Sequence, residues 1–262
     1  MHLEDDQVIH PTAIVDPGAQ LAPDIHVGPY AVIGPGVVIG AGTRIGAHVT
    51  VEGPTIIGEN NHIYQFSSLG AAPQDKKYAG EPTRLEIGDG NTIREFCTLN
   101  RGTVQDAGVT KVGNNNWIMA YVHIAHDCQV GNNTIFANNS SLAGHVHVFD
   151  HAILGGFTLI HQFCKIGSHV ITAVGSVVFK DVPPYVTASG YDAQPHGINA
   201  EGLKRRGFDA DRITMIKRAY KTLYRNGLTL EEAKAALQEQ EDNPDIQLLL
   251  DFLKVSTRGI IR

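Results

Sequence analysis

The chain has 262 residues, a formal net charge of −6 and only 7% aromatic residues. An acidic chain without a recognised nucleic-acid motif argues against a nucleic-acid partner, and the absence of an 18-residue apolar run argues against a membrane span. The opening segment MHLEDDQVIHPTAIV lacks the basic start and apolar core of a signal peptide.

The three cysteines, Cys97, Cys128 and Cys164, are odd in number and form no CxxC pair. This usage indicates a reducing, cytoplasmic location, with packed small side chains and neither disulfides nor a structural zinc site.

An aliphatic residue recurs at every sixth position from Ile9 to Leu69, and the series resumes in register at Ile87. A later series with the same spacing runs from Val112 to Val178. A period of six fits neither a helix nor an isolated strand, and it is typical of hexapeptide β-helix repeats. Three repeats make one triangular coil of 18 residues, so residue i is predicted to lie under residue i+18, about 4.8 Å away.

Two segments interrupt the repeat, residues 71–86 and residues 101–111. The first is polar and replaces most of one coil, and the second shifts the register by one residue. Long loops in compact domains are usually functional. We therefore assign residues 1–190 to a β-helix domain with two inserted functional loops.

The period changes near residue 190, and residues 191–262 are predicted to form a C-terminal helical domain. DADRITMIKRAYKTLYRNG begins with an Asp cap, TLEEAKAALQEQ with a Thr229–Glu232 capping box, and PDIQLLLDFLKVS follows Asn243. Three or so helices would protect the open edge of the β-helix. Residues 199–262 hold twelve Lys/Arg against ten Asp/Glu. This local positive charge suggests an acidic partner, although a solvated helix face would also explain it.

The histidines of two successive coils include His123, His126, His145 and His161. Steps of 18 from His126 reach Gly144 and then Gln162. His126, the Gly144–His145 pair and the His161–Gln162 pair should therefore form one stripe at one corner, within about 10 Å. A lone histidine is more often structural, but this convergence indicates a functional site.

Three chemistries fit such a stripe. Imidazole binds zinc, and hexapeptide carbonic anhydrases hold zinc with three histidines from adjoining subunits, but no matching pair five residues apart is present. Alternatively, one histidine is a general base for a hydroxyl group, with Asp127 holding the tautomer of His126. Third, the histidines of a non-catalytic module donate hydrogen bonds to a sugar nucleotide.

Several segments resemble the UDP-N-acetylglucosamine acyltransferase family that begins lipid A (lipopolysaccharide) biosynthesis: HIAHDCQVGNNTIFANNSSLAGHV, IHQFCKIG, QDKKYAGEPTRLEIGD, DVPPY, INAEGLKRRGF and STRGIIR. The resemblance covers nearly the whole chain. It implies a left-handed parallel β-helix and a cytoplasmic homotrimer with sites between subunits. It also implies transfer of a fatty acyl group, usually 3-hydroxylated, from the phosphopantetheine of acyl carrier protein to the 3-hydroxyl of UDP-N-acetylglucosamine. No metal or other cofactor is expected, and the basic C-terminal face becomes the expected dock for the acidic carrier protein.

The resemblance also implies roles for individual residues. His126 is the general base, Asp127 orients it, and the Gly144 N–H forms the oxyanion hole. Substrate-binding positions are Gln74, Asp75, Lys77, His123, His145, His161, Gln162, Asn199, Glu201, Arg205 and Arg206. Val174 occupies the acyl-chain ruler, where glycine in other members admits a longer chain, so a shorter chain is expected here. Asp192 and Asn100 replace histidines common in the family.

Other functions remain open at this point. The acceptor could be a related molecule such as a 3-amino UDP sugar. The N-acyltransferase later in the same pathway is not expected, because it carries an extra N-terminal domain and the repeats here begin by Ile9. Other classes are a zinc carbonic anhydrase and a non-catalytic sugar-nucleotide-binding or scaffold protein.

Overall fold

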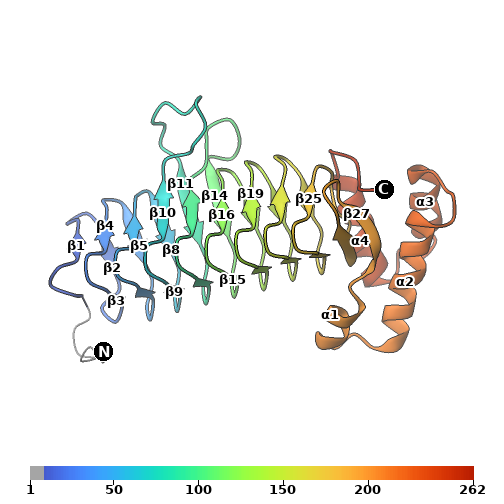
Figure 1. Cartoon of the computed structure of the whole chain (residues 1–262), viewed down its shortest axis with the longest axis horizontal. Helices are drawn as coiled ribbons and strands as arrows, with labels where there is room; N and C mark the ends of the chain where they lie inside the picture. Colours follow the sequence, from blue (N-terminus) through green and yellow to red (C-terminus); the bar gives the residue numbers. More distant parts are fainter. Residues whose placement is uncertain (1–8) are drawn as a thin grey trace.

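Stacked coils form a long parallel β-helix that helices close at its carboxyl-terminal end (Figure 1). The computed structural model describes residues 9–262, so the first eight residues of the predicted β-helix domain lie outside the described part. The inward aliphatic residues of the repeat, such as Ile33, Leu69, Leu99 and Leu142, form one continuous buried core. The predicted fold class, a β-helix followed by helices, is confirmed.

Three sheets form the sides of the prism within the described residues. Sheet 1 contains β1 (Ile14–Val15), β4 (Val32–Ile33), β7 (Thr50–Val51), β10 (Ser68–Ala71), β13 (Thr98–Asn100), β16 (His123–Ile124), β19 (Ser141–Leu142), β22 (Leu159–Ile160) and β25 (Val177–Val178). Sheet 2 contains β2 (Gln20–Leu21), β5 (Val37–Ile39), β8 (Thr55–Ile57), β11 (Arg84–Ile87), β14 (Val109–Val112), β17 (Gln129–Val130), β20 (His147–Val148) and β23 (Lys165–Ile166). Sheet 3 contains β3 (His26–Val27), β6 (Arg44–Ile45), β9 (His62–Ile63), β12 (Thr92–Ile93), β15 (Trp117–Ile118), β18 (Ile135–Phe136), β21 (Ile153–Leu154), β24 (Ile171–Thr172), β26 (Val186–Ser189) and β27 (Gln194–Ile198).

The strand register confirms the 18-residue step. Ile14 pairs with Val32, and His123 pairs with Ser141. The two exceptions on sheet 1 are the pairs that span an inserted loop, Ser68 with Thr98 and Thr98 with His123. Outside the loops and the last coil, where Ile171 pairs with Thr187 at a step of 16, the sequence number of a residue therefore locates it along the prism.

Three corners join the sheets, and many of their turns contain a residue with positive φ. The loop corner, between sheets 1 and 2, carries both inserted loops and then Asp127, His145 and Phe163. The asparagine corner, between sheets 2 and 3, includes Asn60, Asn115, Asn133, His151 and His169. The aromatic corner, between sheets 3 and 1, includes Tyr30, His48, Phe66, Phe96, Tyr121 and Phe157.

Both loops are shorter than predicted. Strand β10 ends at Ala71 and β11 begins at Arg84, so the first loop is 72–83 and not 71–86. Strand β14 begins at Val109, so the second loop is 101–108 and not 101–111. The reason is that sheet 2 resumes early, with four consecutive pairs from Arg84↔Val109 to Ile87↔Val112. Both loops project from the same side of the prism (Figure 1).

The predicted boundary at residue 190 falls inside the sheet. Strand β27 turns back and pairs antiparallel with β26, so residues 194–198 extend sheet 3 and do not belong to a helical domain. The helices are α1 (Ala200–Arg205), α2 (Ala210–Tyr224), α3 (Leu230–Gln238) and α4 (Pro244–Val255). The predicted caps Asp209, Thr229 and Asn243 begin α2, α3 and α4, whereas α1 was not predicted. In the described part of the chain, none of the helices combines the length and apolar character that a bilayer crossing requires.

Candidate active site

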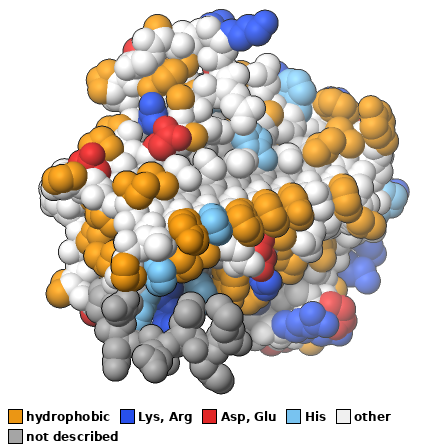
Figure 2. Space-filling view, turned by 60° about the vertical axis from the view of Figure 1, so that its left-hand side comes forward, with side chains coloured by type: hydrophobic (Ala, Val, Ile, Leu, Met, Phe, Trp, Pro, Cys, Tyr) orange, Lys and Arg blue, Asp and Glu red, His pale blue; other side chains and the backbone are white. Residues whose placement is uncertain are grey.

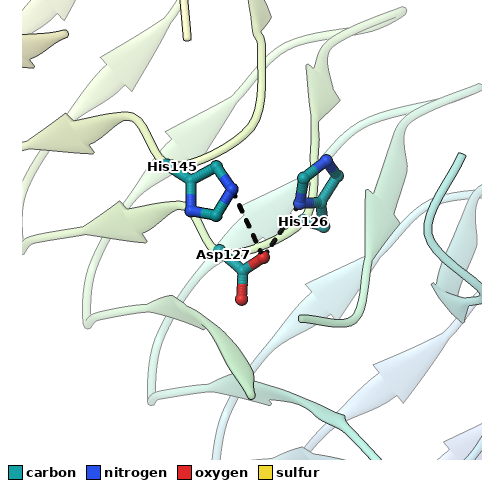
Figure 3. Close-up of side chains that lie close together, drawn as sticks. All are labelled: His126, Asp127 and His145. Atoms are coloured by element: carbon teal, nitrogen blue, oxygen red, sulfur yellow. Dashed lines mark hydrogen bonds and ion pairs between the residues drawn. The ribbon is translucent and has the colours of Figure 1, made fainter. Parts of the chain in front are cut away.

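His126 and Asp127 lie together at the loop corner, in the turn between β16 and β17. The Nδ1 atom of His126 is 2.9 Å from Oδ2 of Asp127, and Figure 3 shows both His126 and His145 directed at this carboxylate. Asp127 therefore accepts the Nδ1 proton of His126, which leaves Nε2 of the ring as the basic nitrogen. The predicted pairing of the two residues is present.

Asp127 is only 1% exposed, but its carboxylate is well partnered. The Thr103 N–H donates to Oδ1 at 2.9 Å, and the Thr103 hydroxyl donates to Oδ2 at 2.7 Å. Burial alone would raise the pKa of Asp127, but the hydrogen bonds from His126 and Thr103, together with nearby His145, lower that pKa below its ordinary value. The carboxylate is thus held ionised beside the histidine.

Gly144 lies one coil beyond His126, as the 18-residue step predicted. The two coils are joined beside it by a hydrogen bond from the His145 N–H to the His126 carbonyl at 3.0 Å. A Cβ atom on Gly144 would come within 2.6 Å of the His126 ring, so only glycine admits the ring here. Among the described residues, no protein acceptor takes the Gly144 N–H.

His145 completes the cluster. Its ring meets that of His126 edge to face, with centroids 5.1 Å apart, and stacks on Phe163 at 4.3 Å. Its Nε2 atom is 3.9 Å from Oδ2 of Asp127, and its Nδ1 atom is 2.8 Å from Oδ2 of Asp106. Two carboxylates therefore flank the His145 ring.

Thr103 and Asp106, on the second loop, were not identified from the sequence. The only signal was the break in the repeat at residue 101, which gave no indication of which loop residues face inward. The loop reaches Asp127 because it leaves the same corner one coil before it, between β13 and β14. The second loop, unexplained by sequence, is thus part of the site.

A cleft of about 950 Å³ opens beside His126 and His145. Both loops line it: the first provides Gln74, Asp75 and Lys77, and the second provides Gln105 and Asp106; Gln162 and Phe163 complete the wall. Arg101 holds the loops together, because its guanidinium donates to the Gly70 carbonyl at 2.7 Å and to the Tyr78 hydroxyl at 3.2 Å. The structure thus brings together most of the predicted residues of this corner.

His123 and His161 lie near this cleft but outside its lining. The His123 ring is held by the Thr98 hydroxyl at 2.7 Å, and burial, followed by the proximity of His126, lowers its pKa. Nδ1 of His161 is 3.3 Å from the Arg258 guanidinium, in the terminal segment.

Another predicted group lies at the asparagine corner. The Asn199 side chain caps α1 and donates to the His169 carbonyl, and Arg206 donates to the His151 carbonyl. Glu201 pairs with Lys204 on the surface, and Arg205 is exposed. Val174 is 75% exposed at the aromatic corner, directly beyond Gly156. The predicted site residues therefore occupy three different corners of one chain.

The cluster has donors that suit a metal ion. One ligand atom each from His126, Asp127 and His145 lie within 4.8 Å of one another. In the structure as described, however, Oδ2 of Asp127 already accepts hydrogen bonds from Thr103 and His126. The arrangement is that of a paired base.

Comparisons with known proteins agree with this architecture. Family models match at residues 181–261 (UDP N-acetylglucosamine O-acyltransferase, domain 2) and at residues 8–41 and 110–144 (bacterial transferase hexapeptide). The chain is 65% identical to the acyl-[acyl-carrier-protein]–UDP-N-acetylglucosamine O-acyltransferase of Janthinobacterium sp. (strain Marseille), over 97% of this chain and 99% of that protein. The same-named protein of Halorhodospira halophila is 57% identical over 97% and 99%.

Solved structures are equally similar. The UDP-N-acetylglucosamine O-acyltransferase of Moraxella catarrhalis has a TM-score of 0.96 at 48% identity, covering 98% of this chain and 100% of that one. The UDP-N-acetylglucosamine acyltransferase of Francisella novicida has a TM-score of 0.96 at 44% identity, covering 97% and 94%.

Proposed function

This chain belongs to the family of acyl-[acyl-carrier-protein]–UDP-N-acetylglucosamine O-acyltransferases, and we propose that it performs their reaction with His126 as general base. It is an acyltransferase that moves a fatty acyl group from acyl carrier protein to UDP-N-acetylglucosamine, in lipid A biosynthesis. We assign the 3-hydroxyl of the sugar as acceptor and a 3-hydroxyacyl group as the preferred donor. The observation that carries the mechanism is the His126–Asp127 pair beside a cleft.

His126 removes the proton from the sugar hydroxyl through Nε2. Asp127 keeps the other ring proton on Nδ1, 2.9 Å away, and stabilises the imidazolium that forms. Because Thr103 fixes both oxygens of Asp127, the base keeps its orientation without substrate. A positioned base of this kind contributes roughly 10²–10⁴-fold in rate.

The sugar oxygen attacks the thioester carbonyl as its proton leaves. The new C–O bond gives a tetrahedral oxyanion, for which the Gly144 N–H is available. When the C–S bond breaks, the imidazolium returns its proton to the departing phosphopantetheine thiolate. The acyl group has then moved from sulfur to the sugar oxygen, and the proton from the sugar hydroxyl to the thiol. These steps need no covalent acyl-enzyme, metal ion or other cofactor.

We propose that neighbouring copies complete the site, in a homotrimer. One chain places its site residues at three corners, so a ligand that contacts all of them must contact more than one copy. Exposed hydrophobic side chains also gather on the surface (Figure 2). At the aromatic corner Tyr30, His48, Phe66, Phe96 and Tyr121 stack with centroids 4.9–5.1 Å apart, a surface suited to contact between copies.

The donor and the location follow from the same function. The basic C-terminal helices would dock acidic acyl carrier protein through charge complementarity. A cytoplasmic location agrees with three buried cysteines whose thiols are free.

An acyl-transfer assay tests the proposal, with UDP-N-acetylglucosamine, its 3-amino analogue and a panel of acyl carrier protein thioesters. The unmodified enzyme should acylate UDP-N-acetylglucosamine, and His126→Ala should lower kcat by roughly 10²–10⁴-fold. His10→Ala, which changes a histidine of the first coil, is the matched control. Full activity of His126→Ala, or loss of wild-type activity on metal chelation, would overturn the mechanism.

A further inference from the structure

Asp106, on the second loop, is hydrogen-bonded to a histidine of the site. Its Oδ2 atom lies 2.8 Å from Nδ1 of His145. The His145 side chain is 11% exposed, whereas that of Asp106 is 46% exposed and lines the cleft. Nothing in the general-base mechanism uses this carboxylate.

The loop that carries Asp106 is tied to the catalytic pair. Thr103 donates two hydrogen bonds to Asp127, and the Gly108 N–H closes the loop on the Thr103 carbonyl at 3.1 Å. At Gly102, a Cβ atom would come within 2.8 Å of Oδ1 of Asp127 and closer still to the backbone of residues 108 and 109. These contacts leave the loop little freedom at its base, so Asp106 is held near His145.

The hydrogen bond to Asp106 determines how the His145 ring is oriented. A carboxylate accepts hydrogen bonds only, so Nδ1 of His145 must carry a proton in either protonation state of the ring. The His145 ring stacks on Phe163 with an angle of 10° between the two ring planes, and this stacking fixes the plane of the His145 ring. With Nδ1 held by Asp106, Nε2 faces Asp127 at 3.9 Å. Without Asp106, the ring would be free to turn over in the same plane.

We propose that Asp106 is a positioning residue for acyl transfer, which acts by holding Nδ1–H of His145 so that Nε2 faces the His126–Asp127 pair. This inference rests on the proposed function for its kinetic consequence. It assigns the second loop two tasks: Thr103 holds the base through Asp127, and Asp106 holds His145.

A double-mutant cycle tests the proposal in the full-length enzyme. Asp106→Ala is expected to lower kcat/KM about three- to tenfold, the scale of a partly exposed charge-assisted hydrogen bond. Asp106→Asn keeps an acceptor oxygen and should recover most of the loss. In a His145→Gln background, Asp106→Ala should have no further effect, because its partner is already gone.

Controls separate this role from loop damage and from net charge. Val104→Ala changes an exposed side chain of the same loop, and Asp242→Asn removes a surface carboxylate between α3 and α4. Both should leave kcat/KM within about twofold of wild type, as surface changes usually do. An equal loss from Asp106→Ala with and without His145 would show that Asp106 acts on the loop alone and would overturn the inference.

A spectroscopic readout makes the test independent of turnover. In enzyme labelled with 15N at histidine, the His145 Nδ1 resonance, identified by its absence in His145→Gln, should shift in Asp106→Ala and stay near its wild-type position in Val104→Ala. An unchanged resonance would refute the hydrogen bond between Asp106 and His145. If the wild-type enzyme failed to acylate the sugar, the proposed function would fall, while this resonance would still report whether Asp106 holds His145.

Discussion

Gly144 lies so close to His126 that a Cβ atom on residue 144 would be 2.6 Å from Cε1 and 2.7 Å from Nε2 of the ring. Gly144→Ala should therefore push the ring out of line with Asp127 and lower kcat by at least about 10²-fold. The backbone of Gly144 is outside the left-handed region, so alanine should not disturb the fold itself. Steady-state kinetics measures the loss, and thermal unfolding checks the fold.

Gly156→Ala is the matched stability control for that change. Its Cβ atom would find its nearest neighbour at 3.4 Å, which is ordinary contact. Similar thermal midpoints for both variants, together with a large kcat loss for Gly144→Ala, would fit the close approach to His126. Wild-type kcat in Gly144→Ala would contradict it.

His169 predicts a loss of stability in mild acid. Burial, followed by the charges of His151 and Arg206, lowers its pKa to about 4 from an ordinary 6.5. Between pH 6.5 and 4, His169 is therefore protonated in the unfolded chain but stays neutral in the folded chain. The contribution of neutral His169 is complete above pH 6.5 and is lost as pH falls toward 4, by roughly 3 kcal/mol at most.

His169→Phe removes the titratable imidazole but keeps an aromatic ring that can stack on Tyr185. Phenylalanine already occupies the same left-handed turn position at Phe66 and Phe163. Urea unfolding at pH 7.5 and pH 5 should show a smaller drop for His169→Phe than for wild type. His10→Phe, at a partly exposed histidine of the first coil, should retain the wild-type drop. Equal drops for wild type and His169→Phe would refute the assignment.

Asp181 fastens the terminal segment to the β-helix. Its buried carboxylate accepts hydrogen bonds from the Lys165 N–H, the Ser256 hydroxyl and the N–H groups of Thr257 and Arg258. Asp181→Asn places an amide donor against these donors, and we expect a loss of about 2–3 kcal/mol in unfolding free energy. Chemical denaturation measures it, with Asp211→Asn on the surface of α2 as control. A stability equal to that of the control would contradict this role.

The repeat predicted more of this structure than any motif did. Because each coil adds one strand to each sheet, Gly144 could be placed beyond His126 by counting alone. The ends of the loops could not be predicted from the repeat, because strands β11 and β14 begin where sheet pairing resumes and not where the sequence becomes apolar. The helix caps could be predicted because they are local: the side chains of Asp209, Thr229 and Asn243 accept hydrogen bonds from backbone N–H groups two or three residues later.

Partners brought together by loops could not be predicted. Thr103 is 24 positions from Asp127 in the sequence and Asp106 is 39 positions from His145, and neither separation is a multiple of the 18-residue coil. The contacts of Asn199 were also not predicted: its side chain caps α1 and donates to the His169 carbonyl. Its role in substrate binding stays a prediction.

Val174 is expected to limit the length of the acyl chain. It is 75% exposed at the aromatic corner, and its Cγ2 methyl lies 3.9 Å from where a Cβ on Gly156 would be. We expect the acyl chain to lie along this column. Removing the valine side chain would then leave room for a longer chain, so Val174→Gly should move the preferred donor to a longer acyl chain. One buried methylene is worth about 0.8 kcal/mol, so the preference should change roughly fourfold per added carbon. Competition assays with acyl carrier protein thioesters of several lengths measure the ratio of kcat/KM values. Val177→Ala, on the strand that follows, controls for general loosening, because it should lower stability without changing the preferred length. An unchanged optimum in Val174→Gly would remove this residue from the acyl groove.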